Sequence, residues 1–338
     1  MKVLIVTDAW YPQVNGVVRT LDTVRGELLA LGHEVAVISP DGFRSVPCPT
    51  YPEIRLALFP RGRVRKEIEA FAPGAIHIAT EGPLGWAARA YCRRHRLPFT
   101  TSLHTRFPEY VHARFRVPVA WGYSVLRRFH RHARGVMVAT PSMREALRER
   151  GFDNLQRWSR GVDTELFRPR DKDFLADKRP ISMFVGRVAV EKNVEAFLSL
   201  QLPGTKYVVG DGPLLDSLKV RFPEVRFTGY KKGEELARHI AAADVFVFPS
   251  RTDTFGLVLL EAMASGVPVA AYPVTGPIDV VNGSKAGVLG EDIGCAARAA
   301  LELSAEDCRE YAMSYSWHAC AEQFLGNLHP FEWGKPAR

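Results

Sequence analysis

Two segments of the sequence combine charged side chains with the spacing that a phosphate-binding site needs. The first segment, Gly186-Arg187-Val-Ala-Val-Glu-Lys192-Asn193, directly follows the apolar run 181–185. Ligands of α/β proteins bind at the carboxyl ends of strands, so two cations placed there are suited to a pyrophosphate. Alternatively, Arg187 and Lys192 are solvated charges at the start of a helix and bind no ligand. The segment alone favours an anion site without establishing one.

The second segment runs from Ser250 to Met263 and carries two carboxylates. Asp253 and Glu261 have seven residues between them, so one carboxylate precedes a predicted helix and the other lies on its second turn. The amides of Phe255, Gly256 and Leu257, where this helix begins, are donors suited to phosphate oxygens. Alternatively, Asp253 is a helix N-cap and Glu261 is solvated. Glu261 lies in an apolar stretch, where a carboxylate requires partners.

A third candidate is the turn after the apolar run 3–7, which brings Gly16 to the start of a predicted helix. Backbone amides at such a position can approach an anion closely, and the helix dipole favours one. Taken alone, an ordinary turn glycine is the simpler interpretation. No G-x-G-x-x-G pattern follows a strand, which argues against a nicotinamide or flavin site.

Short β-branched runs that would position these segments recur along the chain, and they alternate with helical patterns. The clearest helix has apolar residues spaced by three or four from Val17 to Leu31 and stops at Gly32. The predicted strands are 3–7, 34–39, 75–79, 99–103 and 136–140, then 181–185, 206–209, 225–228, 245–248 and 267–272. This alternation predicts an α/β fold with two parallel sheets, each covered on both faces.

A charged segment, residues 167–174, separates the two series of strands and is the predicted interdomain linker. The predicted domains are residues 1–168 and 169–310, followed by a C-terminal helical segment, 311–338. In that segment, 310–328 is predicted to be one helix with Trp317, Phe324 and Leu328 on one side, and it could pack on either domain.

Charge is distributed unevenly between the two halves. Residues 1–169 hold 26 Lys and Arg against 15 Asp and Glu, a net charge of +11, whereas residues 170–338 hold 19 against 22, a net charge of −3. A basic first half suggests an anionic partner, either lipid headgroups or nucleic acid. The five cysteines include no C-x-x-C pair, so neither a disulfide framework nor a zinc site is indicated. We expect a reduced, cytosolic protein whose contact with membranes, if any, is peripheral, because no secretory signal or spanning apolar run is found.

The motifs together resemble a known family. The two donor segments, with Val209-Gly-Asp-Gly-Pro213 between them and Arg160-Gly-Val-Asp-Thr-Glu-Leu-Phe-Arg-Pro169 before them, closely resemble the retaining GT-B glycosyltransferases of family 4. Pro12, Asn15-Gly16-Val17 and His104-Thr-Arg-Phe-Pro-Glu-Tyr110 extend the resemblance over nearly the whole chain. The chain is most similar to the branch of sulfoquinovosyldiacylglycerol synthases, diacylglycerol glycosyltransferases and lipid α-mannosyltransferases.

The resemblance implies two Rossmann-like domains facing across a cleft, with the C-terminal helix packing back on the first. It implies catalytic roles for His104, Arg187, Lys192 and Asp253, with both cations on the donor diphosphate and His104 near the transferred sugar. Glu261 would hold the ribose hydroxyls, and Gly16 would lie under the phosphates from the opposite domain. Gly229, Tyr230 and Lys231 would lie near the nucleobase. The remaining residues implied to bind the donor are Gly186, Phe255, Gly256 and Leu257.

The sequence departs from the family pattern at Asp253, where a glutamate is usual. Losing one methylene withdraws the carboxylate by about 1.5 Å, which leaves open whether Asp253 alters donor choice. The D-x-D at Asp171 and Asp173 lies in the charged linker and is interpreted as solvated surface. We therefore expect no metal and no cofactor, with a UDP- or GDP-sugar as co-substrate.

The basic first half includes a segment, residues 112–134, in which arginines alternate with aromatic and aliphatic residues. Such a segment can lie on an anionic bilayer, or it can be a core-packed helix with a solvated basic face. Nucleic acid is disfavoured, because no nucleic-acid-binding motif accompanies the charge. The resemblance thus predicts a hexosyltransferase with a lipid acceptor at the cytoplasmic face of the cell membrane.

Two other functions remain open on the sequence: a non-hydrolysing nucleotide-sugar epimerase and a catalytically silent nucleotide-sugar-binding module. The sequence does not specify the donor base, the sugar, the acceptor or the oligomeric state.

Overall fold

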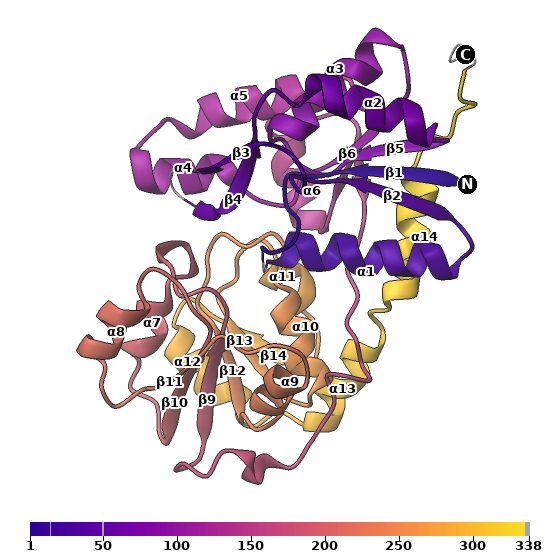
Figure 1. Cartoon of the computed structure of the whole chain (residues 1–338). Helices are drawn as coiled ribbons and strands as arrows, with labels where there is room; N and C mark the ends of the chain where they lie inside the picture. Colours follow the sequence, from indigo (N-terminus) through magenta and orange to yellow (C-terminus); the bar gives the residue numbers. More distant parts are fainter. Residues whose placement is uncertain (14, 49–50, 335–338) are drawn as a thin grey trace. The chain divides into compact units, whose positions relative to one another are not determined.

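A computed structural model describes residues 1–13, 15–48 and 51–334 (Figure 1). By the packing of its Cα atoms the chain divides into two compact units: residues 1–159 with 317–338, and residues 160–316. The predicted domain boundaries fall after residues 168 and 310, whereas these units divide after residues 159 and 316. Among the residues described, no helix is long and apolar enough to cross a membrane.

The first unit is built on a six-stranded parallel sheet with the strand order β2-β1-β5-β6-β7-β8. The strands are β1 (Lys2–Val6), β2 (Glu34–Ile38), β5 (Ala75–Ile78), β6 (Thr100–Ser102), β7 (Gly135–Val138) and β8 (Leu155–Arg157). Five of these confirm the strands predicted for the first half, and the structure adds the edge strand β8. It also adds an antiparallel hairpin, β3 (Ser45–Cys48) with β4 (Tyr51–Ala57).

Helices cover both faces of this sheet, as predicted. They are α1 (Gly16–Ala30), α2 (Arg61–Phe71), α3 (Pro83–Arg94), α4 (Phe107–Phe115), α5 (Val119–His130), α6 (Pro141–Arg148) and α14 (Trp317–Asn327). On one face, Leu4, Ile76 and Val136 of the sheet pack with residues of α2, α3, α5 and α6. On the other, α1 and α14 contact each other, and His77 of β5 meets the Phe324 ring at 4.9 Å (Figure 1).

The C-terminal region differs from the single helix predicted over 310–328. It consists of α13 (Ala305–Met313), which belongs to the second unit, and α14, which belongs to the first. The chain leaves the helical conformation between them because the two helices belong to different cores. Trp317, Phe324 and Leu328 are buried, and Trp158 Nε1 donates to the carbonyl of Cys320 at 3.2 Å. The expectation that the C-terminal helix packs on the first domain is confirmed.

The second unit holds another six-stranded parallel sheet, with the order β11-β10-β9-β12-β13-β14. The strands are β9 (Ile181–Val185), β10 (Thr205–Val209), β11 (Arg226–Gly229), β12 (Val245–Phe248), β13 (Val269–Ala271) and β14 (Gly287–Leu289). The five strands predicted for this half are confirmed, and β14 is added. Its other elements are the 3-10 helices η1 (Lys172–Phe174) and η2 (Val190–Lys192), and the helices α7 (Val194–Leu198), α8 (Leu215–Arg221), α9 (Gly233–Ala241), α10 (Leu257–Ala264), α11 (Pro277–Val280), α12 (Ile293–Ala300) and α13.

Each sheet has one point at which the direction of strand addition reverses. In the first unit the chain moves from β1 outward to β2 and later returns to place β5 on the other side of β1. In the second unit it moves from β9 through β10 to β11, and β12 then pairs with the other side of β9. Doubly wound sheets of this Rossmann-like kind bind ligands beyond the carboxyl ends of the strands at such a switch point.

Candidate functional site

The two predicted phosphate-binding segments lie together at the switch point of the second unit. One follows β9 and the other follows β12, and these strands are hydrogen-bonded neighbours. Asn193 Nδ2 donates to the carbonyl of Pro249 at 3.0 Å, and the hydroxyls of Ser250 and Thr252 donate to the carbonyl of Glu191 at 3.4 and 3.2 Å. These bonds fix the two loops to each other, although more than 50 residues of sequence separate them.

A cation from one loop is paired with a carboxylate from the other. Lys192 Nζ lies 2.6 Å from Asp253 Oδ1, and both side chains are largely buried. Asp253 Oδ2 is buried and has no hydrogen-bond partner among the described residues, so it can accept a hydrogen bond from a ligand. Arg187 is half-buried at the start of the first loop. The alternative in which Lys192 is a solvated charge is therefore wrong.

The helix after β12 begins at a residue that cannot cap it. Its N-cap residue is Gly256, at φ 83°, a conformation that favours glycine, and glycine has no side chain to accept the first amides. The alternative that made Asp253 the N-cap is wrong. Glu261, on the second turn of α10, is 4% exposed, so the alternative of a solvated Glu261 is wrong as well.

Sequence reasoning missed what the glycines of Val209-Gly-Asp-Gly-Pro213 do. A Cβ atom on Gly210 would lie 1.9 Å from the carbonyl oxygen of Gly186, and one on Gly212 would lie 2.4 Å from that of Val188. The loop after β10 therefore packs backbone to backbone against the loop that carries Arg187. Two glycines spaced by one residue after a strand were the available signal for this close approach.

Gly229, Tyr230 and Lys231 lie at the carboxyl end of β11, the edge strand two positions from β9. Tyr230 is 49% exposed, and Lys231 is paired with Glu235 one helical turn away. These residues thus share the carboxyl edge of the sheet with the paired loops but come from a different strand. In the linker, Asp171 and Asp173 are exposed, and the Asp171 carboxylate accepts the Asp173 amide.

The candidates in the first unit lie at its carboxyl edge. Gly16 is the first residue of α1 and is exposed. The helix start is capped internally, because Asn15 Oδ1 accepts from the amides of Val17 and Val18, each at 3.0 Å.

His104 follows β6, and its Nε2 lies 2.8 Å from the hydroxyl of Ser102. The same hydroxyl lies 3.1 Å from Nε2 of the buried His77, whose Nδ1 is 2.9 Å from the hydroxyl of Thr100. The Trp158 ring meets both imidazoles, edge to face, at 5.8 and 5.6 Å. Sequence reasoning missed this polar chain. Polar residues inside the otherwise apolar runs 75–79 and 99–103 were its only signal.

Asp8 is a second residue that sequence reasoning did not single out. It follows β1 at the switch point, is 5% exposed, and accepts from Thr80 Oγ1 at 2.9 Å and from the amides of Leu84 and Gly85 at 2.9 and 3.3 Å. The carboxylate thus caps the start of α3. Burial raises the pKa of Asp8 from 3.8 to about 6, and the hydrogen bonds from Leu84, Thr80 and Gly85 lower it only in part.

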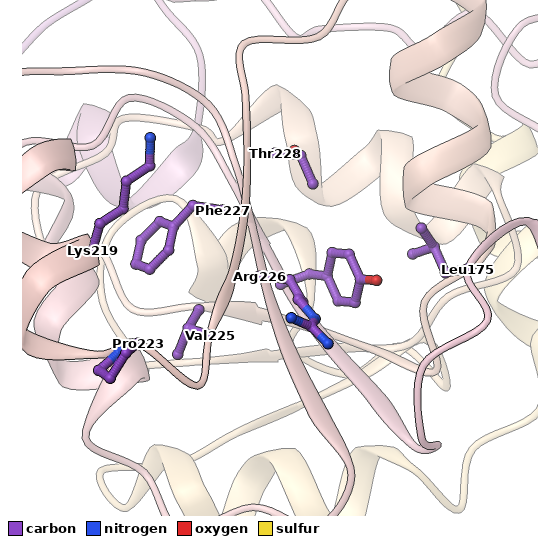
Figure 2. A pocket seen from close by; sticks show the side chains of 8 residues that line it. Leu175, Lys219, Pro223, Val225, Arg226, Phe227 and Thr228 are labelled. Carbon is purple, nitrogen blue, oxygen red and sulfur yellow. The ribbon is translucent and has the colours of Figure 1, made fainter.

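A cavity of about 640 Å³ lies elsewhere in the second unit. Figure 2 shows its lining side chains, which include Leu175, Lys219 and Arg226. They come from the residue after η1, from β10, α8 and β11, and from the turn between α8 and β11. Arg226 is paired with Asp177 at 2.9 Å. None of the lining residues belongs to the loops after β9 and β12, so we assign this cavity no part in the candidate site.

Comparison with known sequences identifies the family. A model described as Glycosyltransferase Family 4 matches residues 14–166, and one described as Glycosyl transferases group 1 matches residues 179–306. The chain is 32% identical to a GDP-mannose-dependent alpha-mannosyltransferase of Mycolicibacterium smegmatis, over 97% of this chain and 96% of the relative. It is 33% identical to the sulfoquinovosyl transferase SQD2 of Arabidopsis thaliana, over 82% of this chain and 61% of the relative. It is 27% identical to an alpha-monoglucosyldiacylglycerol synthase of Acholeplasma laidlawii, over 80% and 79%.

Solved structures share the fold. Sucrose-phosphate synthase from Thermosynechococcus elongatus superimposes with a TM-score of 0.78 at 21% identity, covering 96% of this chain and 97% of that one. Anabaena HepE in complex with UDP and glucose superimposes with a TM-score of 0.71 at 17% identity, covering 96% and 98%. The two Rossmann-like sheets are therefore those of a GT-B fold. With the sequence matches, this shows that the chain belongs to glycosyltransferase family 4 and is a retaining enzyme that uses a nucleotide-sugar donor.

Proposed function

We propose that this enzyme transfers a hexose from a UDP- or GDP-sugar to a hydroxyl group of a membrane lipid, such as diacylglycerol or a glycolipid, at the cytoplasmic surface of the cell membrane. Relatives support the lipid acceptor, since one of them is an alpha-monoglucosyldiacylglycerol synthase. The observation that carries the proposal is an exposed apolar surface on α4 and α5 of the basic first unit.

This α4–α5 apolar surface consists of Phe107, Val111 and Phe115 on α4 with Trp121 and Val125 on α5. Each set is spaced by four residues, so it forms a stripe along its helix. Phe115 is 59% exposed and Trp121 is 69% exposed. The inner face of α5, in contrast, buries Tyr123, Leu126, Phe129 and His130. Residues 112–134 therefore include a core-packed face, which one interpretation of the sequence expected. Their exposed apolar side chains support the other interpretation, a segment that lies on a bilayer.

An anionic bilayer is the occupant that fits this surface. Arg128 and Arg131 are exposed on or next to α5, and each arginine near an anionic surface contributes roughly 1 kcal/mol. Arg127, by contrast, donates to the carbonyl of Arg150 at 2.9 Å and to the Ser124 hydroxyl at 3.0 Å, so it is less suited to lipid phosphates. Exposed aromatic and aliphatic side chains next to arginines are the pattern of a helix lying in a membrane interface.

For the donor, the proposal assigns Arg187, Lys192 and the amides of Phe255 to Leu257 to the diphosphate, where charge develops as the leaving group departs. Glu261 accepts hydrogen bonds from the ribose hydroxyls, and Asp253 accepts one from a hydroxyl of the transferred sugar. Gly186 lies by the phosphates, and Gly229, Tyr230 and Lys231 lie by the nucleobase. Gly16 lies under the phosphates, and His104 lies near the transferred sugar. These assignments rest on the family resemblance.

The proposed reaction breaks the bond between the anomeric carbon and the diphosphate and forms one to the acceptor oxygen on the same face of the sugar. A leaving phosphate oxygen accepts the proton of the acceptor hydroxyl, so the anomeric configuration is retained. Because protein cations and amides stabilise the leaving charge, we expect full activity in EDTA. Loss of activity that magnesium or manganese restores would contradict this part of the proposal.

The test combines a transfer assay with a binding assay. Purified enzyme is incubated with radiolabelled UDP-glucose or GDP-mannose and with vesicles of phosphatidylglycerol that contain diacylglycerol, and labelled lipid is separated by chromatography. We expect label in the lipid with one of the two donors. Conversion of the donor sugar without acceptor would favour an epimerase, and donor binding without any turnover would favour a silent binding module.

In the binding assay, the enzyme should sediment with anionic vesicles and be partly released by high salt. The double variant Phe115→Ser, Trp121→Ser should lose most of the vesicle binding that persists at high salt. The double variant Arg128→Glu, Arg131→Glu should lose the vesicle binding that high salt releases. Val220→Ser, which changes a side chain that is 83% exposed on the second unit, is the control. If all variants bind vesicles equally, or if the wild type does not bind them, the α4–α5 apolar surface is not a membrane-binding surface.

A further inference from the structure

A second cavity, in the first unit, is lined largely by arginines. Its volume is about 270 Å³, and it lies at the carboxyl ends of β7 and β8. The lining residues are Thr140, Pro141, Arg144, Glu145, Arg148 and Arg157. Neither the proposed donor site nor the α4–α5 apolar surface uses any of them.

The fold places these arginines together. Arg144 and Arg148 are four residues apart on α6 and so share a face of the helix. Arg157 is the last residue of β8, where its register partner is Val138, the last residue of β7. Two residues beyond Val138, Thr140 caps the start of α6 by accepting the Met143 amide at 3.3 Å. The end of β8 therefore lies beside the start of α6, and the three arginines line one cavity.

The acidic groups at this cavity do not balance its positive charge. Glu145 is its only carboxylate, paired with Arg148 at 2.9 Å, and both of these side chains are more than half exposed. In the described part of the chain no ion pair is recorded for Arg144 or Arg157. Like charges four residues apart destabilise a helix slightly, and the dipole at the start of α6 adds positive potential.

Packing of the helix does not account for the arginines. Met143 and Leu147 are the buried residues of α6, whereas Arg144, Arg148 and Arg157 are all exposed. Guanidinium groups pair with phosphate oxygens through two parallel hydrogen bonds, and arginine is favoured wherever such recognition matters. The chemistry of the cavity is therefore that of a site for a phosphate group.

We propose that this cavity binds a phosphate group carried by the acceptor, so that the enzyme glycosylates a phosphate-bearing molecule in preference to an uncharged alcohol. The inference rests on the proposed function in taking the enzyme to have an acceptor. Among membrane lipids it favours those that carry a phosphate group over diacylglycerol. The cavity lies at the carboxyl ends of β7 and β8, the same edge of the sheet at which the loops of the switch point lie, although it is not at the switch point itself. The phosphate belongs either to a phospholipid headgroup or to a soluble phosphomonoester.

Binding is measured first, without any transfer. Glycerol 3-phosphate is titrated calorimetrically into the enzyme with the donor site saturated by UDP or GDP. We expect binding by the wild type and a loss of roughly 10-fold or more in affinity for Arg144→Gln with Arg157→Gln, because charge-assisted hydrogen bonds are lost. The control is Arg93→Gln with Arg94→Gln, which removes the same charge from exposed positions in the last turn of α3. Equal loss in both variants would overturn the proposal in favour of a general charge effect.

Transfer is then compared for three acceptors: phosphatidylglycerol in vesicles, soluble glycerol 3-phosphate, and diacylglycerol in phosphatidylcholine vesicles. The proposal expects the Arg144 and Arg157 variant to raise KM roughly 10-fold or more for whichever phosphate-bearing acceptor is used. Use of phosphatidylglycerol alone identifies a lipid headgroup, and use of glycerol 3-phosphate identifies a soluble source. Diacylglycerol as the sole acceptor, with unchanged kinetics in the variant, would overturn the inference. Phosphate binding that depends on these arginines, with no transfer to any lipid, would support the site and contradict the proposed lipid acceptor.

Discussion

Both sheets of this enzyme have a switch point, but the helices that begin there have different starts. In the first unit, the loops after β1 and β5 lead into α1 and α3, and both helix starts are occupied by side chains of the same unit. Asn15 caps α1, and the Asp8 carboxylate caps α3. In the second unit, the loop after β12 leads into α10, whose N-cap residue is Gly256 and supplies no side chain to the helix start.

This difference indicates how one fold serves two purposes. A helix start attracts negative charge, whether it comes from the protein or from a ligand. Asp8 supplies that charge internally, whereas in the second unit we have proposed that the diphosphate of the donor supplies it, beside Arg187 and Lys192. The topology creates the position in both units, and the side chains decide whether a ligand is needed to complete it.

The largest expected effect tests the second switch point directly. Lys192→Ala and Glu261→Ala should each lower kcat/KM for transfer on the order of 100-fold or more, because each removes a group assigned to the donor. Thermal unfolding should stay close to wild type. Lys219→Ala, at an exposed position on α8, serves as the control. Near-native turnover of either variant would remove the second switch point from the donor site.

A substitution at Gly210 tests the packing that supports the Arg187 loop. An added Cβ would meet the Gly186 carbonyl at 1.9 Å, so Gly210→Ala should lower the free energy of unfolding by about 3 kcal/mol and weaken donor binding. In Gly26→Ala, on α1, the new Cβ has no atom within 4 Å, and stability should rise by about 0.5 kcal/mol. Urea unfolding measures both. If Gly210→Ala unfolds at the same urea concentration as the wild type, the loop accommodates the added Cβ without loss of stability.

The Asp8 carboxylate makes the first switch point sensitive to pH. Because burial raises its pKa in the folded protein to about 6, from 3.8, protonation favours folding. This contribution is complete below pH 3.8 and is lost as the pH rises through 6. Between pH 4 and pH 7 the wild type should lose about 2 kcal/mol of stability relative to Asp8→Asn. Urea unfolding at a series of pH values tests this, and parallel curves for the two proteins would contradict it.

The smallest effect concerns the polar chain that ends at His104. Ser102→Ala removes a hydroxyl that lies within hydrogen-bonding distance of both His77 and His104, and stability should fall by about 1 kcal/mol. If Ser102 positions the His104 ring, the pH profile of kcat should also shift, and Ser102→Thr should restore it. A loss of stability with an unchanged pH profile would make the chain purely structural.

Local patterns predicted most of the elements, because apolar periodicity depends only on neighbouring residues. The prediction missed β8, β14 and the β3–β4 hairpin, which are short strands at sheet edges or outside the main sheets. It also joined residues of α13 and α14 into one helix, since both have helical periodicity. Their separation at 314–316 depends on which core each helix covers, and periodicity carries no such information.

For the candidate site, the residues could be named from the sequence but their relations could not. The motifs around Lys192, Asp253 and Glu261 identified the segments, and burial of Glu261 followed from its apolar neighbours. The ion pair between Lys192 and Asp253 could not be foreseen, because it depends on β9 lying beside β12. Asp8 and His77 belong to no recognisable motif. A single polar residue in or beside a strand has many ordinary explanations, so it does not indicate a site.

By itself, then, the sequence determined the alternation of strands and helices, the two candidate donor segments and the resemblance to the family. Only the tertiary structure decided which strands are neighbours, and thereby which loops meet at each switch point. It also decided that the carboxylate of Asp8 occupies the start of α3, whereas α10 begins at Gly256. The physical reason is that strand pairing and burial join residues far apart in the chain, so a carboxylate acquires its partners and its pKa only when the sheet has formed.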